Sequence, residues 1–322
     1  MALKLLPLDA RIPKWDLENL IERSCPICNY PDAYLAYERP DGLNVKFCEK
    51  CHTYFVSPSP SNEQLQTFYE DYDEKHRRAP RISKKKLSAS YEGVDPLTDI
   101  RIRELISLMK FTASRVLDVG FGRAYFLYCL KKLGAIPFGL ELDAQAIEFA
   151  KFLGIDSFKG EIIDFVSEPK YDLITLLDLV EHPLNPMDTL RKSSELLKSG
   201  GLLLIWTPNG DFESLEENPT TFRVDLEHMQ YFTADTCVFI ASELKMRVVH
   251  LETLGFPALE GIDKLFSKNE EHVNFMKKII KSIPGFSTVN TFRHSLFKQD
   301  EKIYQDERMG SYHLFCIMQK PV

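Results

Sequence analysis

The stretch Val116-Leu-Asp-Val-Gly-Phe-Gly-Arg-Ala124 decides the fold class that the sequence predicts. The apolar run Arg115–Val119 predicts a buried strand, and Gly120 and Gly122 give the next turn the freedom to approach a ligand before a helix begins. Asp118 lies two residues before the first glycine. An acid there suits a ligand with an ammonium group and repels a pyrophosphate, which favours an adenosine linked to an amino acid.

A redox dinucleotide is the alternative ligand for such a turn. Its fingerprint places glycine at the first, third and sixth positions, and the sixth residue from Gly120 is Tyr125. Glu141 follows Gly120 by 21 residues and ends a second expected strand, where its carboxylate could accept both hydroxyls of a ribose. Either cofactor could use Glu141, so this residue does not distinguish the two. The turn does: it has no glycine at the sixth position and an acid before the first glycine, which favours the amino-acid nucleoside.

Apolar runs and helical periodicity alternate from about Pro96 onward. Such alternation predicts a parallel sheet that is covered on both faces. The predicted fold is α/β and Rossmann-like, a seven-stranded, mostly parallel sheet with helices on both faces, plus a small N-terminal zinc-binding module. Besides 115–119, strands are expected at 136–142, 155–158, 171–177, 202–206, 247–253 and 312–318. Helices are expected at 60–75, 124–133, 187–198 and 233–244, and from an N-cap at Asp143.

Four of the seven cysteines form two CxxC pairs, Cys25/Cys28 and Cys48/Cys51, separated by 19 residues. Four thiolates on two turns are the ligands of a tetrahedral zinc site, and four protein ligands leave no position for water. The sequence therefore predicts structural zinc, with disulfides or coincidental spacing as alternatives. His52 is left out as a ligand because four sulfurs fill the coordination shell.

The chain of 322 residues is expected to comprise a zinc-binding module (1–60), a helical and basic linker (61–95) and an α/β domain (96–322) with a helical insertion (256–310). The basic run 75–86 is interpreted as a solvated linker or as a positive lip for an anionic substrate. The insertion is interpreted as a cover over the site or as a structural subdomain.

Composition and charge exclude several classes of protein. Hydrophobic residues make up 44% of the chain, which excludes collagen-like and wholly disordered chains. The apolar runs are too short to span a bilayer and the start lacks a signal-peptide core, so a cytoplasmic protein is expected. The net charge of −7 argues against a nucleic-acid partner held by bulk electrostatics.

Over about residues 60–320 the sequence resembles the class I S-adenosylmethionine-dependent methyltransferases. VLDVGFGRA resembles the first motif of that family, GLELD (139–143) its ribose-binding motif, and FKGEIIDF (158–165) the segment that frames adenine. YDLITLLDLVEHPLNP (171–186), LLKSGGLLLIWTPN (196–209) and LEHMQYFTADT (226–236) resemble motifs of its small-molecule branch, related to ubiquinone-biosynthesis methyltransferases. Several motifs in the right order are a specific signal.

The resemblance implies S-adenosylmethionine as cofactor and assigns residues to its parts. Glu161 is expected near the exocyclic amine of adenine and the Ile162 amide at the ring, with Asp178 on the sulfonium side. The expected cofactor-binding residues are Asp118, Gly120, Gly122, Glu141, Glu161, Ile162 and Asp178.

Methyl transfer to a hydroxyl requires a base that is effective near neutral pH, and histidine is closest to that range. His182 follows the fourth expected strand, and His228 lies after the fifth with Glu227 beside it. A structural role for either histidine is the alternative, and Glu181 is interpreted as orienting a histidine or capping the next helix. The candidate catalytic residues are His182, His228 and Glu227.

The cysteine module resembles those of some methyltransferases of deoxysugar and surface-polysaccharide pathways. The sugar C-methyltransferases carry a tyrosine where this chain has Asp225, which favours O-methylation over C-methylation. The expected partner is therefore a small-molecule or nucleotide-sugar acceptor. Two alternatives stay open: an RNA methyltransferase that grips RNA with the cysteine module and residues 75–86, and an inactive methyltransferase-like binding protein.

Overall fold

The computed structural model describes residues 2–5, 12–70, 83–215, 221–255 and 311–322. The chain divides into two compact units, Met1–Thr253 with His313–Val322, and Leu254–Tyr312. The insertion expected at 256–310 and residues 75–82 of the basic run lie outside the described residues.

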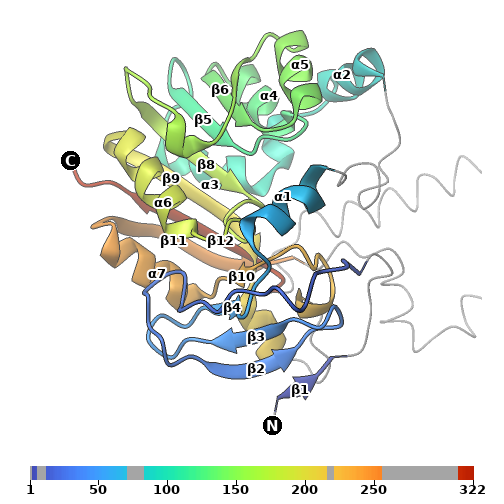
Figure 1. Cartoon of the computed structure of the whole chain (residues 1–322). Helices are drawn as coiled ribbons and strands as arrows, with labels where there is room; N and C mark the ends of the chain where they lie inside the picture. Colours follow the sequence, from blue (N-terminus) through green and yellow to red (C-terminus); the bar gives the residue numbers. More distant parts are fainter. Residues whose placement is uncertain (1, 6–11, 71–82, 216–220, 256–310) are drawn as a thin grey trace, which may run out of the picture. The chain divides into compact units, whose positions relative to one another are not determined.

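The first unit contains a seven-stranded sheet with the strand order β11-β12-β9-β8-β5-β6-β7 (Figure 1). The pairs β5/β6, β6/β7, β5/β8 and β8/β9 are parallel, and β12 runs antiparallel to β9. This is the mostly parallel α/β sheet that the sequence predicts. Its strands are β5 (Arg115–Val119), β6 (Ile136–Glu141), β7 (Asp156–Lys159), β8 (Tyr171–Leu177), β9 (Leu197–Pro208), β11 (Arg247–Leu254) and β12 (His313–Gln319).

Both faces of the central strands are buried. Leu173 and Ile174 are neighbours on β8, so their side chains point to opposite faces, and both are fully buried. Asp143 begins the helix after β6, as expected, by accepting the Gln145 amide at 2.8 Å. The helices are α1 (Asn62–Glu70), α2 (Lys84–Glu92), α3 (Ile100–Leu108), α4 (Tyr125–Lys132), α5 (Ala144–Phe152), α6 (Pro186–Leu196) and α7 (Ala234–Glu243), with short 3-10 helices η2 (Pro96–Thr98), η3 (Ile162–Asp164), η4 (Gly210–Leu215) and η5 (Thr221–Arg223).

The start of β9 differs from the sequence expectation. The sequence predicts this strand at 202–206, after Ser199-Gly-Gly201, but it begins at Leu197, directly after α6. The pairing with β8 shifts register between Tyr171↔Leu197 and Leu173↔Leu202. Gly200 adopts a φ of +74°, which allows this irregularity inside the longer strand.

A second sheet has the strand order β1-β2-β3-β4-β10. Its last strand comes from the α/β part of the chain and pairs antiparallel with β4, with Gln230 opposite Phe55 and Tyr231 opposite Tyr54 (Figure 1). The expected N-terminal module thus forms one sheet with the segment that follows His228. The strands are β1 (Leu3–Lys4), β2 (Tyr34–Glu38), β3 (Asn44–Phe47), β4 (Tyr54–Val56) and β10 (Gln230–Tyr231).

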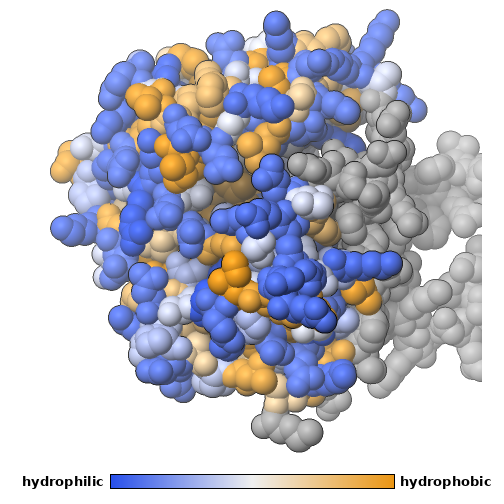
Figure 2. Space-filling model, viewed as in Figure 1, coloured by the Kyte–Doolittle hydropathy of each residue, from blue (hydrophilic) through white to orange (hydrophobic). Residues whose placement is uncertain are grey.

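The surface in Figure 2 is mostly hydrophilic, with hydrophobic side chains in small separate groups. Small apolar groups of this kind are normal on a folded protein. None of the helices that the structure describes is long and apolar enough to cross a membrane.

Candidate functional site

The glycine turn lies where the strand order of the large sheet reverses. From β5 the chain proceeds to β6 and β7 on one side, and β8 and β9 then occupy the other. Val119 at the end of β5 pairs with Leu176 near the end of β8, so the loops after these strands meet at one edge. Open α/β sheets bind ligands at this switch point.

The turn has open space beside it. Gly120 and Gly122 have φ values of +71° and +51°, which L side chains rarely adopt. A Cβ on Gly120 would lie 3.0 Å from Leu179 Cδ1 of the loop after β8, whereas a Cβ on Gly122 would meet nothing within 4 Å. The backbone of Gly122 is therefore open to close approach by a ligand.

Glu141 at the end of β6 connects the glycine turn to the backbone just after the strand. Its carboxylate accepts the Gly122 amide at 2.8 Å and the Leu142 amide at 2.8 Å. Its backbone carbonyl accepts the Gly160 amide at 3.1 Å, which joins the edges of β6 and β7. Glu141, which is expected to bind the ribose, thus also holds the glycine turn in place.

Asp118 is 2% exposed, and its Oδ1 accepts the Thr175 hydroxyl of β8 at 2.7 Å. Burial raises the pKa of this carboxyl to about 7, although Thr175 and the nearby Arg101 lower it. The acid therefore contacts the neighbouring strand rather than the amides of its own turn. Contact with a cofactor through the turn stays a prediction.

The three remaining expected cofactor residues lie at the same edge of the sheet. Glu161 is exposed and directly precedes η3, in which the Ile162 side chain is 3% exposed. Asp178 is exposed after β8, with a φ of +48° and its amide donating to the Trp206 carbonyl at 2.8 Å. The fold brings the ends of β5, β6, β7 and β8 together, as the cofactor prediction requires.

Three side chains form a second polar cluster, the histidine cluster: Glu181, His182 and His228. Each offers one possible ligand atom, and these atoms lie within 4.8 Å of one another. The two rings meet edge to face with centroids 4.9 Å apart. His182 Nδ1 lies 2.9 Å from the hydroxyl of Tyr69 on α1. Two imidazoles and a carboxylate can serve as acid and base, and the same donor set suits a transition-metal ion.

Burial controls the protonation of this cluster. His228 is 5% exposed, and desolvation lowers its pKa to about 4, although the carboxylate of buried Glu227 opposes that shift. Desolvation raises the pKa of Glu181 well above its usual range. Thr207 donates to Glu181 Oε2 at 2.9 Å, while Glu181 Oε1 and His228 Nδ1 have no hydrogen-bond partner within the described part of the chain.

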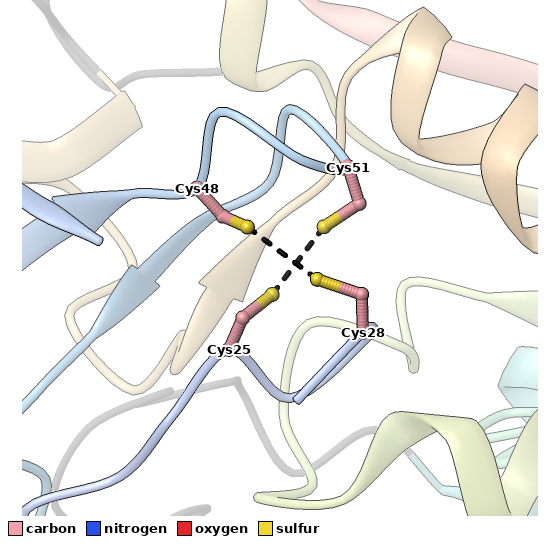
Figure 3. A group of neighbouring side chains, drawn as sticks. All are labelled: Cys25, Cys28, Cys48 and Cys51. Atoms are coloured by element: carbon pink, nitrogen blue, oxygen red, sulfur yellow. Dashed lines mark hydrogen bonds between the residues drawn. The ribbon is translucent and has the colours of Figure 1, made fainter. Parts of the chain in front are cut away.

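The four cysteines of the N-terminal module form one cluster, in which all four Sγ atoms point to a common centre (Figure 3). Cys25 and Cys51 lie 3.3 Å apart between sulfurs, Cys28 and Cys48 lie 3.5 Å apart, and all four lie within 4.8 Å of one another. A tetrahedral ion with Zn–S bonds of about 2.3 Å requires sulfurs about 3.8 Å apart. The cluster therefore fits a single zinc ion.

The two CxxC turns have the same backbone geometry. In each, the residue after the second cysteine has a positive φ, +56° at Asn29 and +59° at His52, and its amide donates to the carbonyl of the first cysteine. The amide of that first cysteine donates in turn to the carbonyl two residues beyond the second. Such matched turns direct both pairs of sulfurs to one point.

His52 does not belong to the sulfur cluster. Its Nδ1 lies 2.9 Å from Asp235 Oδ2, and its carbonyl accepts the Thr233 hydroxyl at 3.0 Å. Thr53 bridges Cys51 Sγ, at 3.2 Å, and the Thr236 hydroxyl, at 3.1 Å. The second CxxC turn is thereby attached to the beginning of α7.

Sequence reasoning missed two contributors to the site. Tyr69 is one of several aromatic residues in the expected helix 60–75 and nothing in the local pattern marks it, yet its hydroxyl contacts His182. Arg39 gave no signal, because a lone arginine in a hairpin is usually solvated, yet its side chain is fully buried against residues 226–231. These contacts join segments that are far apart in the sequence, as the β4/β10 pairing does, and no local pattern indicates them.

Residues 62–251 match the model of a protein family described as methyltransferase domain. A ubiquinone biosynthesis O-methyltransferase of Klebsiella pneumoniae is 25% identical over 196 residues, 58% of this chain and 76% of that protein. Another, of Bordetella avium, is 27% identical over 140 residues, 40% of this chain and 54% of that protein. A crystal structure of a SAM dependent methyltransferase from Archaeoglobus fulgidus has a TM-score of 0.46 and 20% identity, covering 72% of this chain and 96% of that one.

Proposed function

We propose a specific reaction for this chain, which belongs to the methyltransferase domain family and is an S-adenosylmethionine-dependent methyltransferase. The reaction is methylation of a hydroxyl group on a small-molecule acceptor. Two observations support it: relatives named ubiquinone biosynthesis O-methyltransferases, and a pair of histidines beside the switch point of the sheet.

S-adenosylmethionine supplies an electrophilic methyl group. For the cofactor, we propose that the open Gly122 backbone and Glu141 bind the ribose side, and that Asp118 and Asp178 lie on the amino-acid side. Glu161 and the Ile162 amide, from the adjacent edge, bind adenine. An anionic turn of this kind attracts the cationic cofactor more strongly than its neutral product, which assists product release.

His182 is the better candidate for the base. His228 has a pKa of about 4 and is nearly inaccessible, so it accepts a proton poorly at neutral pH. His182 is only half-buried. In the tautomer whose Nδ1–H donates to the Tyr69 oxygen, His182 Nε2 carries the lone pair that accepts the hydroxyl proton of the substrate. The substrate oxygen then bonds to the methyl carbon while the bond between that carbon and the sulfonium sulfur breaks, which releases S-adenosylhomocysteine. Glu181 and His228 pack with the His182 ring and are proposed to hold its orientation, and Glu227 is proposed to act through His228.

The cysteine cluster is proposed as a structural zinc site. Its four sulfurs fill a tetrahedral shell, and three of the four cysteines are at most 2% exposed. Binding by Cys25, Cys28, Cys48 and Cys51 would stabilise a module with few buried apolar residues of its own. No step of methyl transfer requires this ion.

Transfer of a radiolabelled methyl group to a panel of catechols, simple phenols, nucleotide sugars and RNA tests the proposal. We expect label on a hydroxyl of a small molecule, and His182→Gln should lower kcat about 10²- to 10⁴-fold, the usual contribution of a general base. His228→Gln should reduce kcat less. Label on RNA alone, or a fully active His182→Gln variant, would contradict the corresponding part of the proposal.

A further inference from the structure

Arg39, at the end of the β2–β3 hairpin, has a complete set of hydrogen-bond acceptors. Nε and Nη2 donate to the Asp41 carboxylate at 3.1 and 2.5 Å. Nη1 donates to the His228 carbonyl at 2.6 Å and to the Tyr231 hydroxyl at 2.9 Å, and Nη2 also donates to the Leu226 carbonyl. A guanidinium has five N–H donors, so all five are used, in a geometry that lysine cannot reproduce.

Asp41 holds the guanidinium in this orientation. The Trp15 indole donates to Asp41 Oδ2 at 2.8 Å, and the Leu43 amide donates to Oδ1 at 3.3 Å. The side chains of Arg39 and Asp41 are both fully buried. A fully buried ion pair is costly to assemble unless each partner is hydrogen-bonded, and this pair meets that condition.

The segment that Arg39 holds is fixed on its other side by the loop after β8. The amides of Met229 and Gln230 donate to the Glu181 carbonyl at 2.8 and 3.3 Å. The Gln230 side-chain amide donates to the Val180 carbonyl at 2.7 Å and to the Pro183 carbonyl at 2.8 Å. Residues 226–231 therefore lie between the N-terminal hairpin and the loop that carries Glu181 and His182.

We propose that Arg39 is a positioning residue for methyl transfer: through the Leu226 and His228 carbonyls it fixes residues 226–231, and thereby the packing of the His228 ring against His182. The N-terminal module thus contributes to the active site as well as to stability. This inference rests on the proposed function, because the proposed function is what gives the histidine cluster a role in catalysis. Its structural part, the fixation of residues 226–231, can be tested separately.

The test compares wild type with Arg39→Lys and with Arg39→Met/Asp41→Asn, which removes both charges of the buried pair and so limits unfolding. Lys46→Met is the matched control, since Lys46 lies in the same hairpin and its partner Glu22 is mostly exposed. Hydrogen exchange of the Met229 and Gln230 amides should accelerate at least 10-fold in both Arg39 variants and stay unchanged in the control. Amides of β8 should remain protected in all four proteins.

The kinetic arm uses whichever acceptor of the panel is methylated, with S-adenosylhomocysteine as the cofactor probe. We expect kcat to fall 10- to 100-fold in the Arg39 variants while the Kd for S-adenosylhomocysteine changes less than 2-fold. Unchanged exchange at residues 229 and 230 in a folded variant overturns the proposal, and so does a loss of cofactor binding equal to the loss of kcat. If the wild-type protein methylates nothing, the proposed function fails, while hydrogen exchange still decides whether Arg39 fixes the segment.

Discussion

Glu141 and Asp118 are held at the glycine turn in different ways. The Glu141 carboxylate is partly accessible and accepts the amide of Gly122 in the turn and the amide of Leu142, the residue that follows the strand. The Asp118 carboxyl is buried against Thr175 and has a raised pKa. Of these two acids, Glu141 is therefore the carboxylate that a ligand can reach, whereas the Asp118 carboxyl is buried away from water.

Replacing Glu141 by Ala should weaken S-adenosylhomocysteine binding. The change removes an acceptor for ribose hydroxyls and releases the Gly122 amide, and hydrogen bonds to a charged group contribute about 1.5–3 kcal/mol, which corresponds to roughly 10- to 100-fold in Kd. Isothermal titration measures the change. Zinc content should stay the same, and Glu148→Ala, at an exposed pair with Lys84, should bind normally. If Glu141→Ala binds S-adenosylhomocysteine as tightly as wild type does, Glu141 does not bind the cofactor.

Replacing Asp118 by Asn should change how stability depends on pH. The folded pKa of about 7 lies above the usual aspartate value of 3.8, so the folded state binds the proton more tightly than the unfolded state does. This contribution is complete below about pH 4 and is lost as the pH rises to 7, by on the order of 4 kcal/mol at about 1.4 kcal/mol per pKa unit. Relative to wild type, Asp118→Asn should gain stability between pH 4 and pH 8 in urea unfolding. If the stabilities of wild type and Asp118→Asn depend on pH in the same way, the pKa of the Asp118 carboxyl is not raised in the folded protein.

At the scale of elements, strand β6 supports the glycine turn through Gly139. A Cβ at this position would lie 2.3 and 2.6 Å from ring atoms of Phe121, the residue between Gly120 and Gly122. The bare backbone of Gly139 therefore allows Phe121 to pack beneath the turn. A residue in the middle of a strand thus controls the shape of a site that it does not contact.

Gly139→Ala should destabilise the protein by about 1–3 kcal/mol, the usual cost of overpacking, and should weaken S-adenosylhomocysteine binding because the displaced Phe121 ring shifts the turn. Gly93→Ala is the matched control, since its Cβ would meet nothing within 4 Å and its φ is −82°. Thermal unfolding and isothermal titration give the two readouts. Normal cofactor binding in a folded Gly139→Ala variant would show that Phe121 does not set the turn.

The elements of the large sheet were predictable from sequence, whereas the contacts between distant elements were not. Strand β5, the turn and the Asp143 cap depend on local apolar runs, glycines and a capping side chain. Strand β10 is only two residues long and pairs with β4, about 175 positions earlier in the chain. The Arg39 and Tyr69 contacts with the site depend on such packing of distant segments, and no periodic pattern encodes it.

At the scale of the first unit, the cysteine module and the α/β part share a sheet. Besides the β4/β10 pairs, Thr53 contacts Thr236 and the Thr233 hydroxyl donates to the His52 carbonyl. Loss of the proposed zinc should therefore destabilise the start of α7 and residues 226–231 together with the module. A single cooperative unfolding transition is expected for the zinc-loaded protein.

Purified protein should contain one zinc per chain, and Cys25→Ser or Cys51→Ser should lower both the zinc content and the melting temperature. Releasing the metal with a mercurial thiol reagent and a chelator should have the same effect on wild type. Metal analysis and calorimetry measure the two quantities, and Cys129→Ser, at a buried cysteine outside the cluster, is the control for zinc content, which it should leave unchanged. Cysteine variants that keep their melting temperature but lose turnover would show that the metal has a different role.

The most direct measurement is a calorimetric titration of the wild-type protein with S-adenosylhomocysteine and, separately, with NADH. The acid ahead of the glycine turn and the open backbone at Gly122 predict micromolar binding of the first ligand and no heat with the second. Binding of NADH, or no heat with millimolar S-adenosylhomocysteine, would contradict this assignment of the glycine turn.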